Sequence, residues 1–263
     1  MSKHGVDLEQ RGKYSGRSPL FYLFARCPNP LEPRFIRHLA SLQNFNARRL
    51  RDNEGETPLY ALISDAWRSL RTNNERNDCV MSIYRLAIHF DFDVNVVPHS
   101  GPDSGRSILS KICSSPPTSE GHSPHLLTLC RIVIALGVDV HARDQQGRTA
   151  LHFAAFGAMH SVAKYLVKEH KARVDVVDED GNTPLHLAAR GWSGVDPRHR
   201  RRCVRFLLEE GASTIVVNKL RKKPAQCFPR FPQPTRHHDA ELRGELISMM
   251  EDAEQSELRQ IER

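Results

Sequence analysis

Apolar residues recur with helical spacing along much of the chain, and glycines follow several of these stretches. In the segment 160–168 the apolar positions share one face of a helix: Val162, Ala163, Leu166 and Val167. The segment 203–208 repeats such a face and is followed by Gly211, a residue type that commonly ends helices because it tolerates positive φ. Gly137 follows the apolar stretch 126–136 in the same way. The pattern predicts a protein of short amphipathic helices.

Two segments are nearly identical and combine a turn with a helix start. Asp144–Ala155 reads DQQGRTALHFAA and Asp178–Ala189 reads DEDGNTPLHLAA, and their threonines, Thr149 and Thr183, are 34 residues apart. Asp and Gly favour a tight turn, Thr favours the N-cap position, and Pro184 suits the first helical position, where no N–H is needed. Each segment therefore predicts a turn followed by a short inner helix.

Weaker copies surround this pair. Residues 52–59 keep the turn and the cap but have Tyr60 in place of the histidine, 16–20 and 105–109 keep less, and 223–225 is a degenerate last copy. The anchors at positions 18, 57, 107, 149, 183 and 223 are separated by 39, 50, 42, 34 and 40 residues. We expect the longer intervals to hold exposed loops between the inner and outer helices, at 27–30, 71–78, 114–123 and 194–202.

The repeated segment resembles the signature of the ankyrin family, D-x-x-G-x-T-P-L-H-x-A-A, which recurs about every 33 residues. The resemblance covers residues 3–228 and is closest over 144–212. It implies an all-α solenoid of about six stacked helix-turn-helix repeats with β-hairpin fingers, in a domain spanning residues 1–228. It also implies that His152 and His186 are structural, and that the chain binds another protein and is no enzyme.

The C-terminal part of the chain has a different composition. Residues 229–238 form a Pro-rich linker, and 239–263 predict an acidic amphipathic helix that caps the last repeat. The formal net charge is +7, but residues 196–238 carry +8 and residues 239–263 carry −5. We expect these two charged regions to neutralise one another in part.

The resemblance also indicates which residues are spare for a partner, namely those inside the fingers and at the ends of inner helices. They are Gln145, Gln146, Arg148, Phe156, Glu179, Asp180, Asn182, Arg190 and Trp192, with Asn53, Glu54 and Glu56 in an earlier finger. Phe156 and Trp192 each follow an Ala-Ala pair, and large aromatic residues dominate binding hot spots. The alternative is that these two side chains cover a neighbouring loop or repeat.

A basic patch offers a second hypothesis. Its members are Arg198, Arg200, Arg201, Arg202, Lys219, Arg221, Lys222 and Lys223. Such runs serve as solvated surface, as nuclear import signals, or as contacts for nucleic acid and other acidic partners. The absence of interleaved aromatic residues argues against single-stranded nucleic acid. A third hypothesis is a recognition module of a longer enzyme or receptor, because residues 3–9 resemble the tail of a repeat.

Other chemistry has little support. The six cysteines are far apart, which favours reduced thiols over a zinc site, and no pattern predicts a metal, a cofactor or a catalytic set. The longest apolar stretch, 126–140, is shorter than the roughly 20 residues that span a bilayer. The first residues contain no apolar signal segment. We expect a monomer in the cytoplasm or the nucleus.

Overall fold

The computed structural model describes residues 10–19, 21–22, 50–61, 63, 93–101, 103–114, 124–191, 195–228 and 237–262. The chain divides into two compact units. Unit 1 comprises Met1–Ile112 with Thr128–Asp139, and unit 2 comprises Cys113–Leu127 with Val140–Arg263.

Regular structure in the described residues is helical, and these residues contain no strand. The helices are α5 (Ile108–Cys113), α6 (Pro124–Ala135), α7 (Ala150–Phe156), α8 (His160–Lys168), α9 (Pro184–Arg190), α10 (Pro197–Glu209), the 3-10 helix η2 (Pro224–Cys227) and α11 (His237–Ile261). This helical content agrees with the predicted all-α ankyrin solenoid, whereas the fingers, predicted as β-hairpins, contain no strand within the described ranges. The predicted loops at 27–30 and 71–78 lie outside the described residues.

The anchor residues found in the sequence all directly precede a helical turn. Helical residues begin at positions 19, 58, 108, 150, 184 and 224. The hydroxyl oxygens of four anchors accept the backbone N–H three residues further on, at 3.0–3.4 Å: Ser18, Thr57, Ser107 and Thr183. Pro184 occupies the start of α9, as predicted. The N-cap chemistry therefore decides where the inner helices begin.

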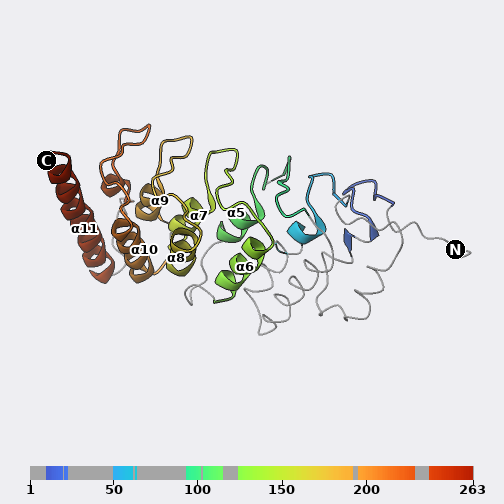
Figure 1. Ribbon diagram of the computed structural model, residues 1–263, viewed down its shortest axis with the longest axis horizontal. Helices are drawn as coiled ribbons and strands as arrows, with labels where there is room; N and C mark the ends of the chain where they lie inside the picture. The colour runs from blue at the N-terminus through green and yellow to red at the C-terminus, as the bar shows by residue number, and fades with distance from the viewer. Residues whose placement is uncertain are drawn as a thin grey trace, which may run out of the picture. The chain divides into compact units, whose positions relative to one another are not determined.

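The inner helices of unit 2 pack through small residues. α7 contacts α9, and α9 contacts η2, so the three form one row (Figure 1). Ala154, Ala155, Ala188 and Ala189 are fully buried. Alanine at these positions permits close approach of neighbouring helices, which buries faces that a single repeat would leave exposed.

The outer helices of unit 2 bury the apolar faces that the sequence predicts. On α8 these are Val162, Ala163, Leu166 and Val167, and on α10 they are Cys203, Val204, Phe206 and Leu207. The rings of His160 and Phe206 meet edge-on between the two helices, with their centroids 5.6 Å apart. Gly211 follows α10 with φ +81°, as predicted for a helix stop.

The basic run near residue 200 is helical, which corrects one expectation. The segment 194–202 was expected to be a loop, but α10 begins at Pro197. The carboxylate of Asp196 accepts the backbone N–H of Arg198 at 2.8 Å and caps the helix. Arginine is a good helix former, and the apolar face at 203–207 needs a helix long enough to pack. These cations are consequently held on a rigid element.

The acidic helix α11 packs on the last repeat, where it contacts α10 and η2 (Figure 1). Leu246 and Met250 are its buried apolar residues. Its carboxylates pair with Arg201, through Glu245 at 2.8 Å, and with Lys223, through Glu254. Glu257 accepts hydrogen bonds from Ser213 and Thr214 at 2.6–2.9 Å. The helix thus caps the solenoid and neutralises part of the basic region.

Candidate interaction surface

The fingers are tight turns held by one aspartate each. In the 144 finger (Asp144–Arg148) the carboxylate of Asp144 accepts the backbone N–H groups of Gln146 and Arg148, both at 2.9 Å. In the 178 finger (Asp178–Asn182) the carboxylate of Asp178 plays the same role at 2.7–2.9 Å. The positive φ of Gly147 and Gly181 completes the turns. Four side chains project from them into solvent: Gln145, Gln146, Glu179 and Asp180.

Neighbouring fingers are hydrogen-bonded in one register. The N–H of the second finger residue donates to the carbonyl of the third residue of the finger before it. In unit 2 these bonds run from Glu179 to Gln146 and from Lys219 to Asp180, both at 2.8 Å. In unit 1 the same bond runs from Asn53 to Ser15 at 3.0 Å. Within each unit these bonds therefore hold the neighbouring fingers in a fixed arrangement.

The two histidines are structural. Nδ1 of His186 accepts the N–H of Thr183 at 3.1 Å, and Nε2 lies 3.0 Å from the carbonyl of Lys222 in the next finger. His152 repeats this arrangement between Thr149 and Asn182. A carbonyl can only accept, so each ring is neutral with its proton on Nε2. Burial lowers the pKa of both imidazoles. Both ring nitrogens are therefore occupied, Nδ1 within the repeat and Nε2 in the bond to the next finger.

Arg148 and Asn182 are less available than the sequence indicated. The Arg148 guanidinium binds Asp144 at 2.8–3.0 Å and lies over the Phe153 ring, 4.7 Å from its centroid. Asn182 is buried: it donates to Asp178 at 3.1 Å and accepts from Asn218 at 2.8 Å. The expectation that the position of Asn182 is not needed for the fold is therefore wrong.

The remaining predicted contacts lie on the inner helices. Phe156 is half-buried at the end of α7, and Arg190 is exposed at the end of α9. Trp192 lies outside the described residues. The exposed set with the firmest support in unit 2 is therefore Gln145, Gln146, Glu179, Asp180 and Arg190.

The basic patch is divided between two elements. Arg198, Arg200, Arg201 and Arg202 lie on α10, whereas Lys219, Arg221 and Lys222 lie on the 218 finger (Asn218–Lys222), followed by Lys223. Arg201 and Lys223 bind α11. The Arg200 guanidinium packs against Gly191, so a Cβ built there would meet it at 2.5 Å, and burial lowers the Arg200 pKa. Arg198, Arg202, Lys219, Arg221 and Lys222 stay exposed.

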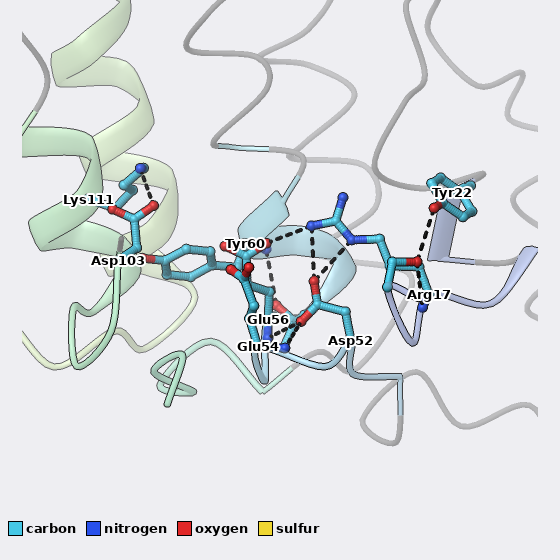
Figure 2. A network of polar contacts seen from close by, with 10 residues as sticks. Arg17, Tyr22, Asp52, Glu54, Glu56, Tyr60, Asp103 and Lys111 are labelled. Carbon is cyan, nitrogen blue, oxygen red and sulfur yellow. Dashed lines mark hydrogen bonds and ion pairs between the residues drawn. The ribbon is translucent and has the colours of Figure 1, made fainter. Parts of the chain in front are cut away.

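In unit 1 an arginine joins successive repeats, as Figure 2 shows. Arg17 binds the carboxylates of Asp52 at 2.9 Å and Glu56 at 3.1 Å. Glu56 is buried, and burial followed by the nearby Asp52 charge raises its pKa to about 7. Glu56 was expected to be spare for a partner, and this expectation is wrong because the side chain is enclosed and paired. Asn53 is exposed and Glu54 half-buried.

Tyr60 replaces the histidine of the repeat and makes an equivalent bond. Its hydroxyl donates to the carbonyl of Arg106 at 3.3 Å, just before the Ser107 cap of the next inner helix. His152 and His186 reach the residue before the next anchor in the same way. The substitution therefore preserves the link between neighbouring fingers. Sequence alone showed the replacement but not this bond.

In the described part of the chain, no group of three or more His, Cys, Asp or Glu side chains is placed to hold a metal ion. Of the helices in these ranges, none has the length and apolar character to cross a membrane.

Comparison with known proteins connects this geometry to a family. The ankyrin repeat model matches residues 121–218 in three copies. The p105 subunit of nuclear factor NF-kappa-B from Gallus gallus is 46% identical over 69 residues, which is 26% of this chain and 7% of that protein. Ankyrin repeat domain-containing protein 53 from Mus musculus is 39% identical over 72 residues, 27% of this chain and 14% of that protein.

A relative with an enzymatic name also matches. ZDHHC13 of Danio rerio, named as a candidate palmitoyltransferase, is 32% identical over 109 residues, 41% of this chain and 15% of that protein. The chain thus spans 15% or less of each of these three relatives. Their likeness to this chain concerns the repeats.

Proposed function

Because the chain belongs, through residues 121–218, to the ankyrin repeat family, whose repeats generally mediate protein–protein interaction, we propose that it is a non-catalytic adaptor or scaffold. In this proposal it binds a partner protein through the fingers and the inner helices of unit 2. The contact residues are Gln145, Gln146, Glu179, Asp180 and Arg190, together with Phe156 and with Trp192, which the sequence predicts. We assign the chain to the cytoplasm or the nucleus, which imaging of the tagged chain would test.

The observation that carries the proposal is the rigid presentation of exposed polar side chains. The turns are fixed by Asp144 and Asp178, and the bond from Glu179 to Gln146 fixes the two fingers relative to one another. A preformed surface loses little conformational entropy on binding, so more of the contact energy appears as affinity. The histidines support a non-catalytic role, because both are buried in bonds between repeats.

The test is affinity capture by the full chain at low and moderate salt. The finger variant carries Glu179→Lys with Asp180→Lys. The matched control carries Glu169→Lys with Glu209→Lys, an equal charge change at exposed positions at the ends of α8 and α10. Phe156→Ala is tested separately. Circular dichroism establishes that each variant is folded.

We expect a discrete protein to be retained at moderate salt by the wild-type chain and by the control, and lost from the finger variant. Equal retention by both double variants would contradict a finger surface. Recovery that collapses with moderate salt or nuclease, and that is the same for the finger variant, would instead favour the alternative, in which the basic patch binds nucleic acid or another acidic ligand by charge alone, without the fingers of residues 144–148 and 178–182.

A further inference from the structure

The 218 finger departs from the two fingers before it at the position of the turn glycine. Gly147 and Gly181 occupy this position with φ +71° and +78°, whereas the 218 finger has Arg221 with φ +56°. The left-handed region is disfavoured for residues that carry a Cβ. A long cationic side chain therefore stands where the fold alone would favour glycine. Such an outlier raises the question of a function.

The tip of this finger is both exposed and rigid. The Leu220 side chain is 74% exposed, and Lys219, Arg221 and Lys222 are exposed around it. The side chain of Asn218 accepts the N–H groups of Leu220 and Lys222 at 3.0 and 3.1 Å, which fixes the turn. Within the described ranges these three cations form no ion pair, in contrast to the neighbouring Lys223, which binds Glu254. An apolar side chain thus stands among three available positive charges.

Another finger is a poor occupant of this tip. A Cβ built at Gly147 would meet the N–H nitrogen of Glu179 at 3.2 Å, and one at Gly181 would meet Asn218 and Lys219 at 3.2 Å. Each glycine thus permits the close approach of the next finger. Arg221 already carries a Cβ at the equivalent position, so a further finger in the same register would be crowded. The geometry disfavours a following repeat or a second copy of this chain.

We propose that the tip of the 218 finger binds an acidic segment of the partner protein. An apolar side chain of that segment covers Leu220, and its carboxylates meet Lys219, Arg221 and Lys222. The charges of the three cations are complementary to such a segment, and Leu220 supplies the contact that fixes its position. A stacked nucleic-acid base would require an aromatic platform, which Leu220 does not provide. The inference rests on the proposed function and names the chemistry of the partner.

The experiment selects ligands for the full chain from a random-peptide library displayed on phage. We expect enriched peptides to combine several acidic residues with one apolar residue. The affinity of an enriched peptide is then measured by fluorescence anisotropy. Leu220→Ser should weaken binding about tenfold or more, as expected for a central apolar contact. Leu258→Ser, at a 43% exposed leucine on α11, is the matched control and should leave the affinity unchanged.

Arg221→Gly separates binding from folding. Glycine relieves the left-handed conformation, so this variant should have a higher thermal unfolding midpoint and yet bind the peptide less tightly. A purely structural role for Arg221 would raise the midpoint without changing the affinity, and this would overturn the proposal. So would enriched peptides that lack acidic residues, or equal competition by single-stranded DNA.

The two proposals fail in different ways. Suppose that a selected peptide binds the Leu220→Ser variant as tightly as the wild type and yet binds the Glu179→Lys, Asp180→Lys variant less tightly. This result overturns the role of the 218 finger and leaves the proposed function standing. If no peptide is enriched while affinity capture still yields a finger-dependent protein, the inference about the 218 finger alone is wrong.

Discussion

Replacing Asn182 with alanine should destabilise unit 2, although the residue lies in a finger. Its side chain is 9% exposed and joins two fingers, because it donates to Asp178 at 3.1 Å and accepts from Asn218 at 2.8 Å. Alanine leaves Asp178 Oδ2 without this donor, and leaves Asn218 Nδ2 with its weak contact to Cys227 at 3.9 Å. Leaving a buried polar group without its partner costs about 1–3 kcal/mol. For the two groups together we expect a loss of about 3 kcal/mol.

Urea unfolding followed by circular dichroism measures this loss. With a denaturant slope of about 1–3 kcal/mol per molar, the midpoint should fall by about 1–3 M. The matched control is Glu179→Ala, an exposed substitution in the same finger that should change stability by less than about 0.5 kcal/mol. Asn182→Asp should also destabilise, because it places a second carboxylate beside Asp178. An Asn182→Ala midpoint equal to that of Glu179→Ala would refute the structural role assigned to this residue.

Further predictions concern pH and the cap. Burial lowers the folded-state pKa of His152 and of His186. Their contribution to stability is therefore full above the unfolded pKa of about 6.5 and is lost as the pH falls below it. Urea midpoints at acidic and neutral pH measure this loss, and His186→Gln should reduce the dependence of the midpoint on pH. The pKa of Glu56 is raised to about 7, so its contribution to stability is full below about pH 4.5 and is lost as the pH rises through 7. Glu56→Gln should remove this loss of stability at higher pH. A variant whose urea midpoint depends on pH as the wild type's does would contradict the shift. Glu257→Ala removes three hydrogen bonds to Ser213 and Thr214, so amide hydrogen exchange in α11 should speed up by about tenfold or more, whereas exchange in α7 should not change.

Much of the fold follows from local sequence. The anchors at Ser18, Thr57, Ser107, Thr149, Thr183 and Lys223 each precede a helical turn. The turn and the cap depend on residues within a few positions of one another, so a single segment reveals them. The structural role of His152 and His186 also followed from the repeat. The start of α10 differs from the prediction, because the arginine-rich segment 194–202 resembles an exposed loop, although Asp196 and Pro197 supply a cap and a favourable first helical residue.

The candidate surface could be predicted only in outline. Gln145, Gln146, Glu179 and Asp180 are exposed, but Asn182 and Glu56 are buried and Arg148 is paired. Asn182 and Glu56 each pair with a residue of the neighbouring finger, 36 and 39 positions away along the chain. The bond from Tyr60 to Arg106 spans 46 positions. No local pattern indicates such pairs, because they arise when two repeats stack.

The sequence by itself determined that this chain repeats a turn, a cap and a short helix, because those preferences act between residues close together along the backbone. Only the tertiary structure decided which polar residues hold the stack and which stay exposed on its surface. The reason is burial: a side chain such as Asn182 or Glu56 becomes structural when the next repeat removes it from water and supplies its hydrogen-bond partner. The same contacts leave Leu220 and its three neighbouring cations exposed at the tip of the 218 finger.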